Sequence, residues 1–312
     1  MPTLDIPYLL PFTSLLVYGP TGAGKSLQAA RLAEYIGIHT GKKTIVFLAD
    51  EQGSRHAYAE HPFVERIITP EGNPWLWMGE AMANRFQGKP AWTDQTGLII
   101  HESLKHYAEL VKAECSRLGA LGVSIGGGGA HNVTLYPPDI PTHVTKRPGD
   151  DTGKLVPKRK LTPEEEAQTV EIGSSNMTHY GVSQEAIDRG LKMSRGPVPT
   201  LFTSLETLAK PKAGAVAQIG PMTVGDAQVS SIPPLVTYTF RLYNTDGKVT
   251  LHLKPHNVGP RTEAMANARI PLRGKGIKIP DTLTGDDALP AALELLWKRR
   301  AAALEETKAL VK

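Results

Sequence analysis

Three short segments in the first hundred residues are almost continuously apolar: residues 14–18, 44–49 and 97–100. Strands that are buried on both faces of a parallel sheet have this unbroken pattern, whereas strands with one face in water alternate between apolar and polar residues. Stretches with apolar residues three and four positions apart, at 26–36 and 102–118, predict helices after the first and third of these strands. The alternation of strand and helix predicts an α/β protein with a mostly parallel central sheet flanked by helices.

The alternation resumes in the second half of the chain and then changes character. A helix over residues 183–193 and a buried strand over 198–203 come first. Apolar and polar residues then alternate over 236–242, and a turn at 244–247 leads into a second alternating run at 249–253. Period-two runs joined by a turn that contains Asp-Gly predict an antiparallel hairpin, which we place at the C-terminal edge of the sheet.

We expect the core to span residues 1–285. One segment inside it and one segment after it differ in character. Glycine and proline make up 14 of the 45 residues from 119 to 163, a density typical of loops. We therefore expect a long basic loop inserted in the core at about 119–165. Residues 286–312 carry leucines along one side and a Lys-Arg-Arg cluster beside them, which predicts a C-terminal amphipathic helix.

Composition narrows the class of protein. The single cysteine, Cys115, cannot close a disulfide within the chain, which excludes a small secreted scaffold built on disulfides. The first twelve residues hold no Lys or Arg, unlike a signal peptide, and no apolar run approaches the length of a membrane span. We expect a soluble, cytoplasmic protein. Its net charge of +4 mildly favours an anionic partner.

Residues 19–26 read Gly-Pro-Thr-Gly-Ala-Gly-Lys-Ser and match every position of the phosphate-binding loop G-x-x-x-x-G-K-[ST]. A predicted strand precedes the motif and a predicted helix follows it, which is the context that the motif requires. Its glycines allow successive backbone N–H groups to face a phosphate, Lys25 can reach the β- and γ-phosphates, and the Ser26 hydroxyl can bind Mg²⁺. The sequence therefore predicts binding of ATP and Mg²⁺, with Lys25 also stabilising charge during catalysis. The predicted nucleotide contacts are Gly19, Pro20, Thr21, Gly22, Ala23, Gly24, Lys25 and Ser26.

Acidic residues follow the second and third predicted strands, at the carboxyl edge of the sheet where ligands of open α/β sheets bind. Glu51 is the candidate general base that activates water, and Asp50 is the alternative. Glu102 is the candidate magnesium ligand, although aspartate is commoner at such a position. His101, Glu102 and His106 form H-E-x-x-x-H, one residue longer than the H-E-x-x-H zinc motif, so we do not expect zinc.

Basic residues are concentrated in three segments. The first is the loop at about 119–165, and the second is the loop that holds Lys210 and Lys212; both contain glycine. The third, residues 254–278, follows the predicted hairpin. Mobile basic loops suit a phosphodiester backbone, which every nucleic-acid sequence presents. Solvated loops are commonly charged in any protein, so binding of nucleic acid and simple solvation both stay open. The candidate nucleic-acid contacts are Lys158, Arg159, Lys160, Lys210 and Lys212.

The order of these parts resembles the RecA-like recombinase core, and in particular the compact single-domain ATPases of that group that bacteriophages encode. The phosphate loop comes first, followed by strands ending in Glu51 and in Glu102-Ser103, a basic loop, a helix, a strand, a second basic loop and a hairpin. The resemblance covers the chain from about residue 12 to about residue 280, and the phosphate loop is its most specific part. It implies that Glu51 activates water and that Glu102-Ser103 is the acid-serine pair of the family.

The same resemblance implies contacts with DNA and with a second subunit. DNA would lie against the loops at 119–163 and 206–223. The family usually senses the γ-phosphate with an asparagine-glutamine pair, where this chain has Thr203-Ser204. A cation from the neighbouring subunit would complete the nucleotide site. The candidates for this cation are Lys254, Arg261 and Arg269.

The activity that the resemblance implies is ATP hydrolysis between the subunits of a homo-oligomeric ring or filament. The protein would bind single-stranded DNA and act in recombination or repair, in the cytoplasm of a bacterial host if a phage encodes it. Two other functions stay open on the same residues. One is a phosphate-loop motor for DNA packaging or unwinding, and the other is a nucleotide-controlled assembly protein with little hydrolysis.

Overall fold

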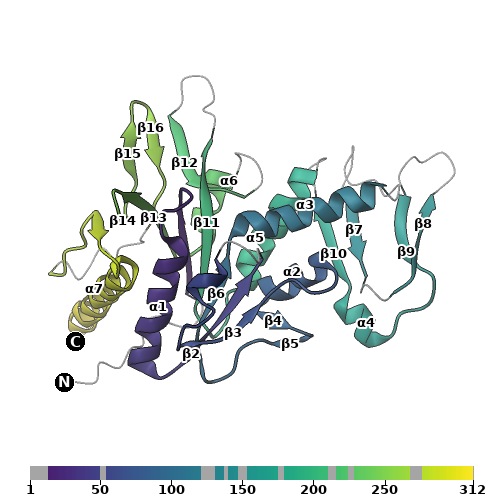
Figure 1. The fold of residues 1–312 in the computed structure, drawn as a ribbon, viewed down its shortest axis with the longest axis horizontal. Coiled ribbons are helices and arrows are strands. Elements are labelled where there is room, and N and C mark those ends of the chain that lie inside the picture. The colour runs from purple at the N-terminus through teal and green to yellow at the C-terminus, as the bar shows by residue number, and fades with distance from the viewer. Residues whose placement is uncertain are drawn as a thin grey trace.

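A mostly parallel sheet runs through the centre of the protein, and helices pack on both of its faces (Figure 1). The computed structural model describes residues 13–49, 54–120, 131–136, 140–146, 153–174, 179–209, 216–223, 228–267 and 276–311. At this level the predicted α/β architecture is confirmed.

Neighbouring strands of the parallel part are far apart in the sequence. Their order is β3 (Val64–Ile68), β2 (Lys43–Leu48), β6 (Thr96–Glu102), β11 (Thr200–Ala209), β1 (Ser14–Gly19) and β13 (Tyr238–Thr245). The four strands predicted from unbroken apolar runs are confirmed as β1, β2, β6 and β11. The chain passes from β1 to β2 on one side and reaches the other side only with β13, so the strand order reverses at β1. Open α/β sheets bind their ligands at such a reversal.

The predicted hairpin is confirmed as β13 and β14 (Lys248–His252), which pair antiparallel. Its placement at the edge of the sheet is wrong by one strand. A short strand, β17 (Thr282–Thr284), pairs with β14 and lies outside it. A run of three residues is too short to show a periodicity, so no pattern along the chain predicts this strand.

The helices of the two faces fill separate cores. The first core contains α1 (Lys25–Thr40) and α7 (Ala288–Val311), and the second contains α2 (Pro74–Met82), α3 (Leu104–Ala120) and α5 (His179–Met193). Successive residues of the parallel strands enter opposite cores; Leu16 is in the second, for example, and Leu15 and Val17 are in the first. Among the described residues, no helix combines the length and the apolar character needed to cross a bilayer.

The first helix is longer than the predicted 26–36. It continues through Gly37 and ends at Thr40, where Gly41 adopts the left-handed conformation (φ 69°) and donates its N–H to the Gly37 carbonyl. Gly37 lies inside the helix and has a packing role, because a Cβ atom there would lie 2.1 Å from the ring of Phe63.

The C-terminal helix α7 is confirmed and packs on α1. Its residues Leu289 and Leu296 are buried in the first core. The buried Gln28 side chain of α1 donates to the carbonyls of Gly285 and Asp286 (3.3 and 2.7 Å) and accepts the N–H of Leu289 (2.9 Å). One side-chain amide of α1 therefore caps the first turn of α7.

Strand β11 continues past the parallel sheet. Residues 206–209 of β11 pair antiparallel with β12 (Ala217–Pro221), and β16 (Thr262–Ala264) and β15 (His256–Gly259) follow. We call these four strands the outer sheet, which projects beyond the carboxyl edge of the parallel strands (Figure 1). The sequence predicted β11 only to residue 203, because its apolar run ends there.

The segment predicted to be a long loop contains regular structure in its described parts, so that prediction is wrong for them. Strand β7 (His131–Leu135) pairs with β10 (Val170–Ser174), and β8 (Thr142–Lys146) pairs with β9 (Gly153–Pro157). Helix α4 (Pro163–Gln168) follows, with a capping box between Thr162 and Glu165. The short runs of β-branched residues were concealed by the surrounding glycines and prolines.

Short elements complete the described chain. They are η1 (Arg55–Ala57), β4 (Arg85–Phe86), β5 (Lys89–Pro90), α6 (Gln228–Ser231) and η2 (Pro233–Leu235).

Candidate nucleotide-binding site

The predicted phosphate loop connects the carboxyl end of β1 to the N-terminus of α1. Gly22 and Gly24 adopt left-handed conformations, with φ of 76° and 90°, which glycine tolerates best. Gly24 is the N-cap of α1 and has no side chain to bond the first-turn N–H groups. These groups have no acceptor within the helix and lie at the positive end of its dipole, so they suit an anion.

Gly19 allows the loop to lie directly against the hairpin. A Cβ atom at this position would be 2.0 Å from the backbone oxygen of Leu242 in β13. The loop is closed on its other side by a hydrogen bond from the N–H of Ala23 to the Pro20 carbonyl (3.3 Å). The first glycine of the motif is therefore required for packing, whereas Gly22 and Gly24 are required for backbone conformation.

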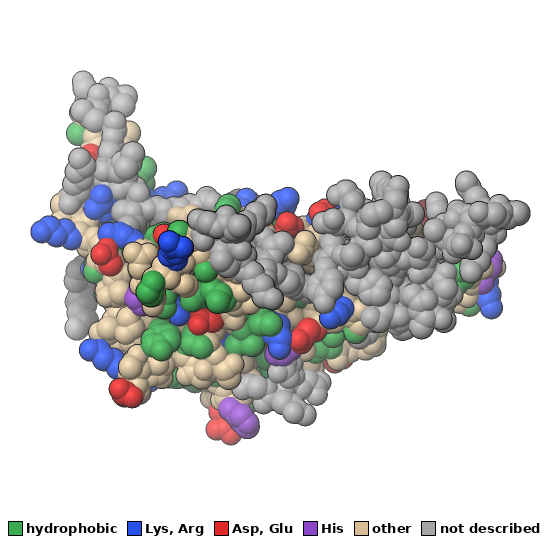
Figure 2. Space-filling view, turned by 90° about the horizontal axis from the view of Figure 1, so that it is seen from above, with side chains coloured by type: hydrophobic (Ala, Val, Ile, Leu, Met, Phe, Trp, Pro, Cys, Tyr) green, Lys and Arg blue, Asp and Glu red, His purple; other side chains and the backbone are tan. Residues whose placement is uncertain are grey.

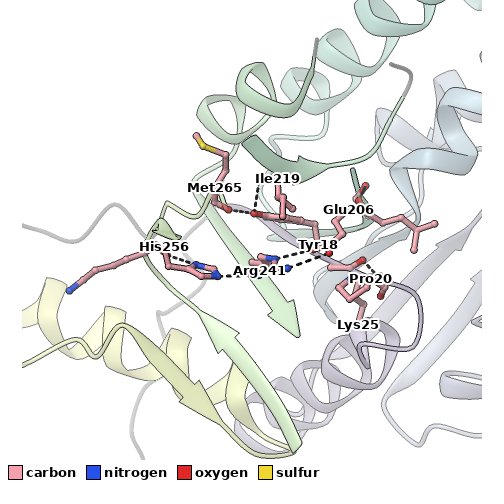
Figure 3. A network of polar contacts seen from close by, with 12 residues as sticks. Tyr18, Pro20, Lys25, Glu206, Ile219, Arg241, His256 and Met265 are labelled. Atoms are coloured by element: carbon pink, nitrogen blue, oxygen red, sulfur yellow. Dashed lines mark hydrogen bonds and ion pairs between the residues drawn. The ribbon is translucent and has the colours of Figure 1, made fainter. Parts of the chain in front are cut away.

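Lys25 lies across the loop that precedes it. Its Nζ donates to the carbonyl oxygens of Gly19 (3.1 Å) and Pro20 (2.8 Å). Lys25 and Pro20 are labelled in Figure 3. Burial lowers the pKa of Lys25, and the nearby carboxylates of Glu102 and Glu206 partly offset this. The approach of an anion to a partly desolvated cation of this kind lowers the free energy of the site.

A cavity of about 410 Å³ lies beside the loop, within the size range of small-molecule sites. It brings together five residues of the predicted phosphate loop and the predicted magnesium ligand. It is lined by Thr21, Gly22, Gly24, Lys25, Ser26, Leu27, Leu48, Ser54, Glu102, Ser103, His106, Thr203 and Leu205. The other predicted loop contacts, Gly19, Pro20 and Ala23, form the frame of the loop and do not line the cavity.

Glu102 is the last residue of β6 and is almost fully buried, with 2% of its surface exposed. Both of its carboxylate oxygens accept hydrogen bonds, one from the hydroxyl of Tyr58 and one from that of Thr203 (2.5 Å). Burial and the negative charge of Glu102 raise the pKa of Tyr58 well above its usual value, so Tyr58 stays protonated and donates. Thr203 in turn accepts the backbone N–H of Ser103 (2.9 Å), which has a left-handed conformation (φ 64°).

The segment after β2 also contacts the phosphate loop. Ser26 donates its hydroxyl hydrogen to Ser54 Oγ (2.9 Å). The candidate bases Asp50 and Glu51 lie outside the described residues. Leu48 and Ser54, on either side of them in the chain, both line the cavity.

The residues of the cavity fit a magnesium ion. Ser26 and Glu102 offer a hydroxyl and a carboxylate oxygen, and Mg²⁺ prefers hard oxygen ligands with the rest of its shell filled by water and phosphate. Within the described ranges, no three His, Cys, Asp or Glu side chains come close enough together to hold a metal on their own. An Mg²⁺ ion that shares a phosphate ligand commonly takes only one or two side chains from the protein.

His101 is fully buried in the core. Its ring stacks between Phe47 and Phe202, with ring centroids 5.0 and 4.8 Å away. Its two nitrogens bond the hydroxyl of Tyr107 and Oδ1 of Asn84, both at 2.9 Å. Burial lowers its pKa to about 3, so the ring is neutral.

A polar network behind the phosphate loop was not expected from the sequence (Figure 3). Arg241 of β13 is paired with Glu206 of the outer sheet (2.9 Å) and donates to His256 Nε2 of β15 (3.1 Å). Tyr18, the residue before the loop, donates its hydroxyl to the Met265 carbonyl. Arg241 occupies a polar position of an alternating strand, which normally faces water, but its side chain is only 4% exposed. The alternating pattern of β13 cannot show that residues distant in the sequence cover this face of the strand.

The candidate DNA contacts have different surroundings. Lys158 and Lys160 are exposed. Arg159 is paired with Glu165 by two hydrogen bonds of 2.6 and 2.8 Å, which lower the pKa of Glu165 to about 2. Lys210 and Lys212 lie outside the described residues. On the face seen in Figure 2, the described Lys and Arg side chains are scattered among acidic ones instead of forming one patch.

The candidate trans cations also differ from one another. Lys254 is paired with Asp281 at 2.5 Å. Arg261 is exposed at the turn between β15 and β16, with φ of 58°. Arg269 lies outside the described residues. Arg261 is therefore the more exposed of the two candidates that the structure describes.

No known protein-family model matches the chain, and a search of curated proteins found no relative.

Proposed function

We propose that the protein binds ATP with Mg²⁺ and hydrolyses it, as an ATPase that resembles the RecA-like recombinase core and acts on DNA. One observation carries this proposal: Lys25 and Ser26 of a complete phosphate loop line the same cavity as the buried carboxylate of Glu102. The cavity lies at the carboxyl edge of β1, where the strand order reverses.

Each residue has a distinct task in this proposal. The first-turn N–H groups of α1 and the Lys25 ammonium bind the phosphates and stabilise the negative charge that develops on them. Ser26 and Glu102 hold the magnesium ion, which offsets charge on the phosphate oxygens when it is bound. Glu51 is proposed to accept the proton of the attacking water, because the segment that contains it begins and ends beside the cavity.

The order of the described elements supports the proposed resemblance. The phosphate loop, strand β6 with Ser103 after it, β11 and the β13–β14 hairpin follow one another in the order that the resemblance implies. Action on single-stranded DNA in recombination or repair, and assembly into a ring or filament, belong to the same proposal. The exposed charges of Lys158, Lys160 and Arg261 are the described features that suit these partners.

Binding and hydrolysis of ATP by the purified protein, with and without Mg²⁺ and single-stranded DNA, test the proposal. Lys25→Ala should keep the fold, because it removes a partly buried charge, and should cut turnover by at least about a hundredfold. Lys192→Ala, which removes an exposed lysine of α5, is the control. Undiminished hydrolysis by Lys25→Ala would contradict the proposed site. Stimulation by DNA supports a recombination ATPase or another DNA motor, whereas ATP binding with negligible turnover supports an assembly protein.

A further inference from the structure

Two hydroxyl groups from different parts of the fold determine the position of the Glu102 carboxylate. Tyr58, which follows η1, donates to Oε1, and Thr203 of β11 donates to Oε2. Tyr58 and Thr203 are each 1% exposed, so water does not compete for these bonds. An ionised carboxylate has about four acceptor positions, so two such bonds leave a lone pair on each oxygen for another ligand.

The two donors are themselves held in place. The hydroxyl of Thr203 accepts the Ser103 N–H, which directs its own hydrogen toward Glu102. Tyr58 donates its N–H to the Arg55 carbonyl (3.0 Å), which fixes it at the end of η1. Four residues before Tyr58, Ser54 accepts the hydroxyl hydrogen of Ser26. The segment 54–58 thus contacts both Ser26 and Glu102, the residues whose oxygens are proposed to bind magnesium.

We propose that Tyr58 and Thr203 are positioning residues that orient the Glu102 carboxylate for magnesium in the nucleotide site. This inference rests on the proposed function. Neither hydroxyl needs to touch the nucleotide or the ion; each fixes one oxygen of Glu102 and so removes the rotational freedom that the carboxylate would lose on binding. Partners of this kind typically change metal affinity by about 10- to 100-fold when they are removed.

The test is the magnesium dependence of nucleotide binding, which does not require turnover. A fluorescent ATP analogue is titrated in EDTA and then at increasing Mg²⁺ concentrations. For Tyr58→Phe and Thr203→Val we expect the half-saturating Mg²⁺ concentration to rise about tenfold, while the affinity in EDTA stays that of the wild type. Thr203→Ser keeps the hydroxyl and should restore most of the magnesium response.

Tyr107→Phe is a matched control. Tyr107 is as buried as Tyr58, but its hydroxyl bonds His101 in the core (2.9 Å) and not Glu102. Its magnesium response should equal that of the wild type, even if its thermal stability falls. If Tyr58→Phe does not fold, the comparison of Thr203→Val with Thr203→Ser decides the question.

The outcomes separate the two proposals. Wild-type protein that binds no nucleotide, with or without Mg²⁺, contradicts the proposed function. If the wild-type protein binds Mg²⁺-nucleotide but Tyr58→Phe and Thr203→Val respond to Mg²⁺ as Tyr107→Phe does, the positioning role is contradicted. The proposed function then stands. Equal loss of affinity in EDTA and in Mg²⁺ also contradicts it, because a general distortion of the cavity would then be the cause.

Discussion

Arg241 and Glu206 form an ion pair of 2.9 Å that connects the outer sheet to the parallel sheet behind the phosphate loop (Figure 3). The Arg241 side chain is 4% exposed and that of Glu206 is 20% exposed, so the pair is largely removed from water. The carboxylate of Glu206 also acts on Lys25, whose pKa it raises against the effect of burial. Glu206 therefore contributes both to the contact between the outer sheet and β13 and to the electrostatics of the nucleotide site.

We expect Glu206→Gln to lower the free energy of unfolding by about 3 kcal/mol, because it leaves the buried guanidinium of Arg241 without a countercharge. Urea denaturation measures the change. Glu185→Gln, which breaks the exposed pair with Arg189 on α5, should cost less than about 1 kcal/mol. Equal, small losses in the two variants would show that the Arg241–Glu206 pair contributes no more than a surface pair.

The water-activating role proposed for Glu51 makes a kinetic prediction. Glu51→Gln should leave ATP binding intact and reduce turnover by about a hundredfold or more, the usual effect of removing a general base. Single-turnover hydrolysis and equilibrium nucleotide binding, measured side by side, separate the two effects. Asp50→Asn serves as the control, and the opposite pattern would assign the base to Asp50.

Binding of DNA should depend on salt through the exposed lysines of the insertion. Replacing Lys158 and Lys160 together with alanine should flatten the slope of log affinity against log salt concentration by about one to two units, because fewer counterions are released. Adding Arg159→Ala should change the slope little, since Glu165 already neutralises Arg159. Binding of single-stranded oligonucleotides across a salt series measures these slopes. Wild-type affinity and slope in the double variant would show that these lysines are only solvated.

The neutral His101 predicts a loss of stability in acid. Its pKa of about 3 in the folded protein is below the value of about 6.5 in the unfolded chain, so the unfolded state binds the proton first as pH falls. The stabilising effect is fully present above about pH 6.5 and is lost toward about pH 3, with about 2 kcal/mol lost between about pH 7 and about pH 5. Denaturation at both pH values measures it. His101→Gln should lose this component, whereas His56→Gln, which changes an exposed histidine, should keep it.

Much of the parallel sheet could be predicted because its strands are buried on both faces. In a chain without a membrane-length segment, continuous apolar runs as short as those of β1 and β6 are typical of such strands. The position of Glu102 follows from the same logic, since an acid at the end of one parallel strand lies at the same carboxyl edge of the sheet as a phosphate loop at the end of another.

The rest of the site depends on contacts that no local pattern encodes. Tyr58 lies 44 positions before Glu102, and Glu206 lies 35 positions before Arg241. Each is an ordinary polar residue in its own segment and acquires its role only when the fold brings distant segments together. The outer sheet was missed for a related reason, because half-exposed strands of three to five residues carry too few positions to show a period.

The amide of Gln28 gives the C-terminal helix a direct link to the helix that begins at Lys25. Leu289 N–H donates to Gln28 Oε1 within a buried contact, so its hydrogen exchanges with solvent only when α7 separates from α1 or the first turn of α7 opens. The exchange rate at Leu289 is therefore a reporter of the contact between α7 and the phosphate-loop helix. A label at this one amide would record whether the helix is held more firmly when a ligand occupies the loop, without any measurement of the ligand itself.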